Sequence, residues 1–131
     1  GNIQQLIWDK LFTNVSLSAL TGVLQVPMGY IAADSYAWEM AVTLIKEAVA
    51  VAEAMGLDFD EERIIERVRQ TSEGSPEGRT SIYTDLSLGR KTEVNTISGA
   101  VVRAGEKMGI PVPSHRMIVN MVHAMEDKSR Q

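Results

Sequence analysis

The sequence contains no cysteine, which excludes a disulfide framework, a thiol nucleophile and a thiolate metal site. It also has no basic block, since 13 Lys and Arg stand against 17 Asp and Glu for a formal net charge of −4. That balance argues against a nucleic-acid-binding surface, which requires a positive patch. No apolar run is long enough for a membrane span, because charged residues interrupt every long helical pattern. The absence of cysteine fits a reducing compartment, so we expect a cytoplasmic protein.

Several motifs of cofactor and metal sites are also missing. The sequence has no GxGxxG fingerprint after a strand, no Walker-type phosphate loop and no HExxH pair. We therefore expect no self-contained nucleotide site within this chain. His115 and His123 lie eight residues apart on one predicted helix, about 12 Å of rise, which is too far to share one ion. We expect no metal site and interpret both histidines as surface or capping residues.

The hydrophobic periodicity predicts an all-α fold of about six helices. The 131 residues suffice for one domain with one core. Helices are expected at residues 3–24, 34–55, 61–71, 81–88, 93–108 and from 114 onward, with a turn at 26–29 and a loop at 72–78. The chain begins with Gly-Asn directly before a helical pattern. We therefore expect residues 1–131 to be one domain of a longer protein.

One side of the first predicted helix has an unusual polar composition. Lys10, Asn14, Ser18 and Thr21 are spaced four, four and three residues apart, so they form one stripe. Water-facing helix surfaces favour long charged residues, whereas Asn, Ser and Thr are poor helix formers. A single lysine above short amides and hydroxyls therefore indicates the wall of a polar cleft. The residues expected to be buried on the opposite side are Ile3, Leu6, Ile7, Leu11, Val15 and Leu20.

A second polar stretch covers residues 81–99. Ser81 and Asp85 lie four residues apart, which places them on one side of a short helix. Gly89 is predicted to end that helix, and Thr92 is predicted to cap the next one, with Glu93 in its first turn. Ordinary helix capping explains these residues as well, with Ser81 as a plain N-cap.

Lys10 has two interpretations. It is either a solvated lysine whose stem covers apolar surface or a group that neutralises a developing alkoxide. The second role needs a carboxylate to orient the lysine and small donors to fix a substrate. Asn14 and Ser18 can supply the donors, and Glu93 the carboxylate, provided that the two helices meet.

The polar motifs form an ordered set along the chain. They are Trp8-Asp-Lys-Leu-Phe-Thr-Asn14, Ser81-Ile-Tyr-Thr-Asp85, Gly89-Arg-Lys-Thr-Glu93, Gly99 and Gly109-Ile-Pro-Val-Pro113. Over essentially the whole chain this set resembles the C-terminal domain of the ketopantoate reductases (2-dehydropantoate 2-reductases). The resemblance implies a helical substrate-binding domain, like that of ketopantoate and 6-phosphogluconate dehydrogenase-type reductases. It also implies an N-terminal Rossmann domain, absent from this chain, that holds NADPH.

The resemblance also assigns roles to individual residues. Lys10 matches the lysine that hydrogen-bonds the keto oxygen and acts as general acid, and Glu93 matches the glutamate that works beside it. Asn14 matches an asparagine that lines the substrate pocket. Ser81 matches the serine that binds the substrate carboxylate, and Asp85 matches a supporting acid.

Some positions depart from the family pattern. Ser18, which we include in the substrate site, stands where a second asparagine is frequent. Gly78 and Ser98 also replace asparagines, and Ile82 replaces a methionine. The catalytic pair is thus retained while several substrate-facing amides are not. A 2-oxo acid other than ketopantoate is compatible with this pattern.

We therefore expect the substrate half of an NADP-dependent 2-oxo-acid reductase, either 2-dehydropantoate 2-reductase of pantothenate biosynthesis or a paralogue. The isolated chain should be inactive, and a homodimer is compatible with it. One alternative is a non-catalytic helical dimerisation or interaction module, built on the alanine-rich second helix and on Met117, Met121 and Met125 of the last helix. Those methionines are either core filler or the side of a helix-binding groove. A regulatory domain for an acidic metabolite is a third possibility, and it would not need Glu93.

Overall fold

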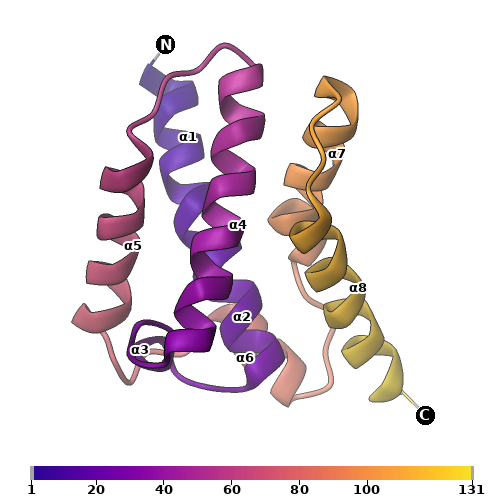
Figure 1. Cartoon of the computed structure of the whole chain (residues 1–131). Helices are drawn as coiled ribbons and strands as arrows, with labels where there is room; N and C mark the ends of the chain where they lie inside the picture. The colour runs from indigo at the N-terminus through magenta and orange to yellow at the C-terminus, as the bar shows by residue number, and fades with distance from the viewer. Residues whose placement is uncertain (1, 131) are drawn as a thin grey trace.

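The structure is a computed structural model that describes residues 2–130, and it is all-α as predicted (Figure 1). No strand occurs within those residues. A first helical run joins α1 (Asn2–Thr13), the π-helical segment η1 (Asn14–Ser18) and α2 (Ala19–Leu24). The remaining elements are α3 (Met28–Ala33), α4 (Ser35–Ala54), α5 (Glu61–Gly74), α6 (Ser81–Ser87), the 3₁₀ turn η2 (Val94–Thr96), α7 (Ser98–Met108) and α8 (Pro113–Lys128).

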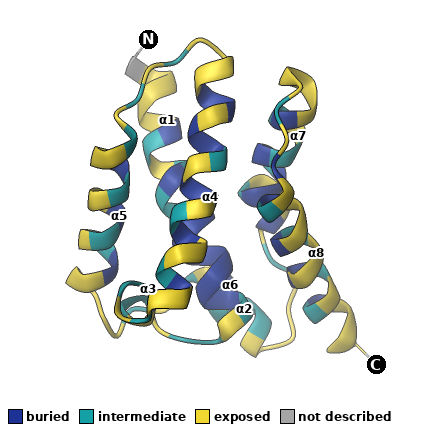
Figure 2. Ribbon diagram, in the orientation of Figure 1, coloured by how far each residue is buried: buried dark blue, intermediate teal, exposed yellow. Residues whose placement is uncertain are grey.

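Helix α4 forms the centre of the molecule. It contacts α1, α5, α7 and α8, and Figure 1 shows α1 and α5 on one side of it and the α7–α8 hairpin on the other. The inner faces of these helices are buried (Figure 2). Ala37, Ala41 and Ala48 of α4 are fully buried, and their small side chains let neighbouring helices approach closely. The alanine-rich second helix therefore packs at the centre of the fold.

Most predicted helix ends are confirmed by their capping geometry. The Asp34 carboxylate accepts a hydrogen bond from the Ala37 N–H at 2.9 Å, and Asp60 accepts one from Arg63 N–H at 3.3 Å. Gly56 and Gly89 follow α4 and α6 with φ of +91° and +71°, in the left-handed region that glycine favours. Local sequence signals thus determine these boundaries.

Two parts of the predicted helix pattern are wrong. Helix α3 begins at Met28, within residues 26–29 that were predicted to be a turn. It was missed because six residues are too few to show a hydrophobic period. The helix predicted at 93–108 begins only at Ser98, after the 3₁₀ turn η2 and a break at Ile97 with φ −106° and ψ −91°. Glu93 therefore does not lie in the first turn of α7, and the helix-dipole argument does not apply to it.

Several apolar residues predicted to be buried are exposed. Ile3 has 75% of its surface exposed, and Leu6 and Ile7 are also exposed, because the first turns of α1 extend beyond the core. Met117 is 63% exposed, and Met121 is exposed as well. The interpretation of these two methionines as core filler is thus wrong. No helix within residues 2–130 combines the length and apolarity that crossing a membrane requires.

The N-terminus of α8 is capped by a side chain from another helix. Glu47 of α4 accepts hydrogen bonds from the Ser114 N–H at 2.9 Å and the His115 N–H at 3.1 Å. The same carboxylate lies 2.8 Å from Nδ1 of His115, whose side chain is fully buried. His115 was expected at the surface or as a cap. That expectation fails because its contact with Glu47 spans 68 residues of sequence.

The Glu47–His115 pair makes the stability of the fold sensitive to acid. Burial lowers the pKa of His115 from its ordinary 6.5, although the Glu47 hydrogen bond opposes this. Burial raises the pKa of Glu47, but the hydrogen bonds from His115 and from the Ser114 and His115 amides outweigh it, so the net pKa lies below 4.5. Neutral His115 can donate its Nδ1–H to Glu47, while Nε2 is buried without a partner.

Stability should therefore fall as the solution is acidified. Because both folded pKa values are depressed, the unfolded chain binds more protons, beginning below pH 6.5 for His115 and below pH 4.5 for Glu47. The free energy of unfolding should be constant above about pH 7 and should decrease steadily towards about pH 4. Urea unfolding across this range measures the effect. A free energy that rises on acidification from pH 7 would contradict the assignment.

Candidate functional site

The residues of the predicted polar stripe pass from exposed to buried along the first helical run. Lys10 on α1 is exposed and Asn14 is half-buried, whereas Ser18 is 8% exposed and Thr21 is fully buried. The Thr21 and Thr80 hydroxyls lie 2.7 Å apart, which closes the stripe at this end. The stripe is therefore open to solvent only at Lys10 and Asn14.

The middle of this stripe is a π-helical segment that the sequence did not predict. It spans Asn14–Ser18, so it begins and ends at two of the predicted substrate-binding residues. Short π-helical insertions are frequent at functional sites, because the widened turn redirects side chains and frees carbonyl groups. The Ser16 hydroxyl donates to the Phe12 carbonyl at 2.7 Å, and the Thr21 hydroxyl donates to the Leu17 carbonyl at 2.6 Å. These bonds use one carbonyl just before the insertion and one within it.

Helix α6 brings Ser81 next to the closed end of the stripe. Thr80 caps this helix by accepting from the Tyr83 N–H at 3.2 Å, so the interpretation of Ser81 as the N-cap is wrong. The Thr80 hydroxyl also lies 3.5 Å from the Ser18 carbonyl. Ser81, the first residue of α6, is exposed. The capping role thus falls to its neighbour, and the Ser81 hydroxyl does not serve as the N-cap.

Helix α6 packs directly on the backbone of α2. A Cβ atom placed on Gly22 would lie 2.4 Å from Cγ2 of Ile82, which is fully buried. Only glycine permits this approach, because a β-branched methyl held in the core cannot move aside cheaply. The glycine therefore sets the distance between α2 and the residues that follow Ser81.

Gly22→Ala should destabilise the fold by about 1–3 kcal/mol despite the better helix propensity of alanine. The clash should also displace α6 and with it Ser81. Gly74→Ala is a matched control, because Gly74 is helical and a Cβ atom added there would have no neighbour within 4 Å. That control should be neutral or stabilising by up to about 1 kcal/mol in urea unfolding. Equal effects of the two changes would contradict the packing argument.

Glu93 lies on a different part of the structure, in the segment that leads into η2. It is exposed, and its carboxylate accepts from the Thr96 hydroxyl at 3.2 Å. The next residue, Val94, is buried in a small apolar cluster with Ile82 and Val122. Ser81 and Glu93 therefore each precede, in the sequence, a residue of the same cluster, Ile82 and Val94 respectively.

The structure thus brings some predicted residues together and leaves others apart. Ser18 and the start of α6 are adjacent, and the cluster of Ile82 and Val94 links α6 to the Glu93 segment. Asp85 is half-buried on α6. No ion pair joins Lys10 to Glu93 within the described part of the chain. Over the same residues, no three His, Asp or Glu side chains gather as metal ligands.

Two residues that support this region had no sequence signal. Thr80 connects α6 to the stripe, and Glu126 of α8 holds the backbone before Glu93. Each acts over more than 30 residues of sequence, so no local spacing could have indicated either of them.

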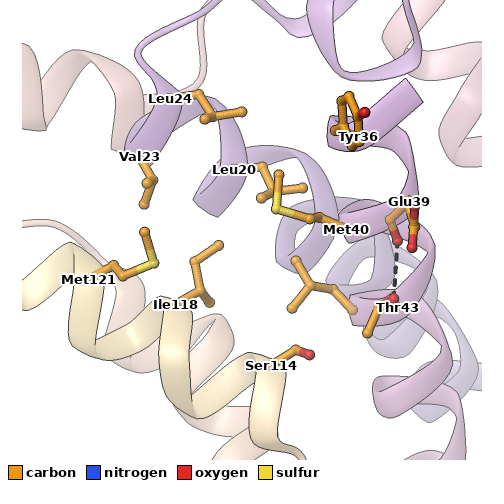
Figure 3. Close-up of a pocket in the computed structure, with 11 residues that line it drawn as sticks. Leu20, Val23, Leu24, Tyr36, Glu39, Met40, Thr43, Ser114, Ile118 and Met121 are labelled. Atoms are coloured by element: carbon orange, nitrogen blue, oxygen red, sulfur yellow. Dashed lines mark hydrogen bonds between the residues drawn. The ribbon is translucent and has the colours of Figure 1, made fainter. Parts of the chain in front are cut away.

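An apolar groove of about 430 Å³ lies away from these residues, between α2, α4 and α8. Figure 3 shows the side chains of the three helices converging on it. Its lining is Leu20, Val23, Leu24, Tyr36, Glu39, Met40, Thr43, Leu44, Ser114, Ile118 and Met121, and none of these is a predicted site residue. An exposed surface of this composition is typical of a docking face more than of a site for a small acid.

Residues 2–126 match the family model described as the C-terminal domain of PanE/ApbA ketopantoate reductases. The 2-dehydropantoate 2-reductase of Archaeoglobus fulgidus is 33% identical over 126 residues, which are 96% of this chain and 42% of that protein. A ternary structure of D-mandelate dehydrogenase with NADH and anilino(oxo)acetate superposes with a TM-score of 0.91 at 29% identity, covering 99% of this chain and 43% of that one. The dimeric ketopantoate reductase of Staphylococcus aureus gives 0.88 at 25% identity, covering 98% and 45%. The chain spans about two fifths of the length of these relatives.

Proposed function

The chain belongs to the ketopantoate reductase family, whose C-terminal domain it matches, and we propose that it is the substrate-binding half of an NADP-dependent 2-oxo-acid reductase. In this proposal residues 1–131 form one helical domain, and a preceding Rossmann domain holds NADPH. The chain has no glycine fingerprint of its own, which supports a cofactor site outside it. Its relatives are more than twice as long, which supports a further domain.

The proposed chemistry assigns each site residue one task. The nicotinamide cofactor, when bound, supplies the hydride that adds to C2 of the 2-oxo acid. Lys10 hydrogen-bonds the keto oxygen and donates a proton to the alkoxide that forms there, and Glu93 orients Lys10. Ser81 binds the substrate carboxylate. Asn14 and Ser18 line the pocket, and Asp85 supports it.

A single observation supports the proposal: one helical run presents Lys10 and Asn14 at its solvent-accessible end, and its buried end at Ser18 and Thr21 contacts Thr80, the residue before Ser81. Lys10 and Asn14 are accessible, Ser18 ends the π-helical segment, and the Thr80 hydroxyl lies 3.5 Å from the Ser18 carbonyl. Lys10 is solvated in this chain, so the enclosure that the reaction needs must come from the preceding domain.

The identity of the substrate is the more specific part of the proposal. Ketopantoate, reduced to pantoate in pantothenate biosynthesis, fits the relatives named 2-dehydropantoate 2-reductase. Another 2-oxo acid fits the presence of Ser18 in place of a pocket asparagine, and it fits the similarity to D-mandelate dehydrogenase, whose ternary structure holds anilino(oxo)acetate. The use of NADPH in preference to NADH and a cytoplasmic location belong to this proposal as well.

NADPH oxidation tests the proposal in two proteins. One is this 131-residue chain alone, and the other is the longer protein in which a nucleotide-binding domain precedes it. The chain alone should show no turnover, and the longer protein should oxidise NADPH with ketopantoate or with another 2-oxo acid. Turnover by the isolated chain, or no turnover by the folded longer protein with any 2-oxo acid, would refute it.

A non-catalytic dimerisation module is the second candidate, and the apolar groove favours it. Exposed Met40, Met121 and Tyr36 border that groove and would be covered in a homodimer. A homodimer is also compatible with the reductase, since the S. aureus neighbour is described as dimeric. Sedimentation together with the NADPH assay separates the candidates. A dimer without turnover favours the module, and turnover favours the reductase in any oligomeric state.

A further inference from the structure

A buried carboxylate on α8 holds the segment that carries Glu93. Glu126 is only 6% exposed, and its Oε2 accepts from both the Thr92 N–H and the Thr92 hydroxyl, each at 2.8 Å. The residue lies in the last turn of α8, where the helix dipole disfavours an anion. Burial adds a desolvation cost. A hydrogen bond with His123 and the two from Thr92 offset these costs.

The same carboxylate reaches the other side of Glu93 through a histidine. Glu126 Oε1 lies 2.8 Å from Nδ1 of His123, and Nε2 of His123 lies 2.9 Å from Oδ1 of Asn95. A protonated His123 ring donates to Glu126 Oε1 and to Asn95 Oδ1. A neutral ring that donates from Nδ1 to Glu126 has an acceptor at Nε2, so the Asn95 amide must turn to present its NH₂ group. The network therefore attaches α8 to Thr92 and Asn95, which lie on either side of Glu93 in the sequence.

The segment between these anchors, residues 92–95, has little regular structure of its own. The turn η2 has three residues, too few for a stable 3₁₀ helix in isolation. The Thr92 hydroxyl accepts from the Val94 N–H at 3.2 Å, so fixing Thr92 also fixes the start of this turn. The position of Glu93 thus depends on what anchors Thr92 and Asn95.

We propose that Glu126 and His123 are positioning residues that fix segment 92–95 on α8 and so hold the Glu93 carboxylate at the substrate site. This inference rests on the role proposed above for Glu93. Burial raises the pKa of Glu126, but hydrogen bonds from His123 and Thr92 outweigh it, so the net pKa is lowered and the carboxylate is ionised at neutral pH. The other charged groups around this network are Lys91, Asp127 and Arg130.

The first test is amide hydrogen exchange in the 131-residue chain. In Glu126→Ala the Thr92 amide should exchange at least about tenfold faster, because its acceptor is gone. Asp127→Asn is the matched control, since it removes one negative charge from the next, exposed position. The control should leave Thr92 exchange unchanged. His123→Ala removes the contacts with Asn95 and with Glu126 Oε1 but leaves the Glu126–Thr92 bonds in place, and it serves as a second variant should Glu126→Ala fail to fold.

The second test is steady-state kinetics of the longer protein. Glu126→Ala should lower kcat on the order of ten- to a hundredfold and change KM less, because a displaced Glu93 affects the reacting oxygen more than substrate binding. His123→Ala should lower kcat severalfold, and Asp127→Asn should leave kcat unchanged. If Glu126 served only the stability of the fold, Glu126→Ala would lower the melting temperature, but the folded enzyme would not show a fall in kcat larger than the change in KM.

Two results would overturn the inference. One is unchanged Thr92 exchange in Glu126→Ala, and the other is faster exchange with kcat unaltered. If the unmodified longer protein reduces no 2-oxo acid, the proposed function fails instead. The exchange measurement still decides in that case whether Glu126 holds the segment.

Discussion

Replacing Lys10 by methionine should lower kcat for 2-oxo-acid reduction by about 10²–10⁴-fold in the longer protein. Methionine has a similar length but no charge and no proton to donate. The alkoxide that forms at the former keto oxygen would then lose both its hydrogen bond and its proton source. Because Lys10 is exposed, the change should leave the melting temperature of the chain nearly unaltered. Stopped-flow or steady-state NADPH oxidation measures the loss.

Two further variants separate the roles open to this lysine. Lys10→Arg keeps the positive charge but cannot release a proton readily. A loss nearly as large as that of Lys10→Met would assign a proton-donor role, and substantial retained activity would assign an electrostatic one. Lys107→Met makes the same chemical change at an exposed position of α7 and should have no effect. A Lys10→Met enzyme with more than a tenth of the original kcat would contradict both roles.

Removing the Glu47 carboxylate should lower the free energy of unfolding by about 3 kcal/mol. Glu47→Ala leaves three donors without their acceptor, namely the two amides at the start of α8 and Nδ1 of His115. His115 is fully buried, so its Nδ1–H would lose its partner inside the fold. This loss is a large fraction of the stability of a small domain.

Glu39→Ala is the matched control for this prediction. Glu39 lies on the same helix, two turns earlier, and its side chain is exposed. It should cost no more than about 0.5 kcal/mol in urea unfolding. Glu47→Gln keeps an acceptor but loses the charge, so its effect should be intermediate. Equal unfolding free energies for Glu47→Ala and Glu39→Ala would show that the interhelical cap does not stabilise the fold.

The elements that could be predicted from the sequence are those with local causes. Asp34, Asp60 and Gly89 mark helix ends because their capping bonds or backbone angles involve only nearby residues. The long helices follow from hydrophobic periodicity, and the family could be identified from its ordered motifs. Helix α3 was missed because it is shorter than two turns.

The remaining features depend on residues that meet only after folding. Glu47 resembles any charged surface residue of α4 until α8 packs against it. The exposed Ile3 looks like a core residue, because periodicity shows which side of a helix is apolar and not whether anything covers it. Thr80 and Glu126 likewise acquire their roles through long-range hydrogen bonds.

The same distinction holds for the candidate site. The spacing of Lys10, Asn14 and Ser18 predicted a shared surface, and the structure places them on one helical run. The π-helical segment between Asn14 and Ser18 has no sequence signature that we recognised. No ion pair joins Glu93 to Lys10 within residues 2–130, so their pairing stays a prediction.

The most direct test of the central claim is a crystal structure of the longer protein with NADP⁺ and a 2-oxo acid. The measured quantity is the distance from Nζ of Lys10 to the keto oxygen. We predict a hydrogen bond of about 2.7–3.2 Å, with the Ser81 hydroxyl on the substrate carboxylate. A 2-oxo acid bound away from Lys10, or a Lys10 side chain directed into solvent in that complex, would contradict the assignment of this chain as a catalytic substrate domain.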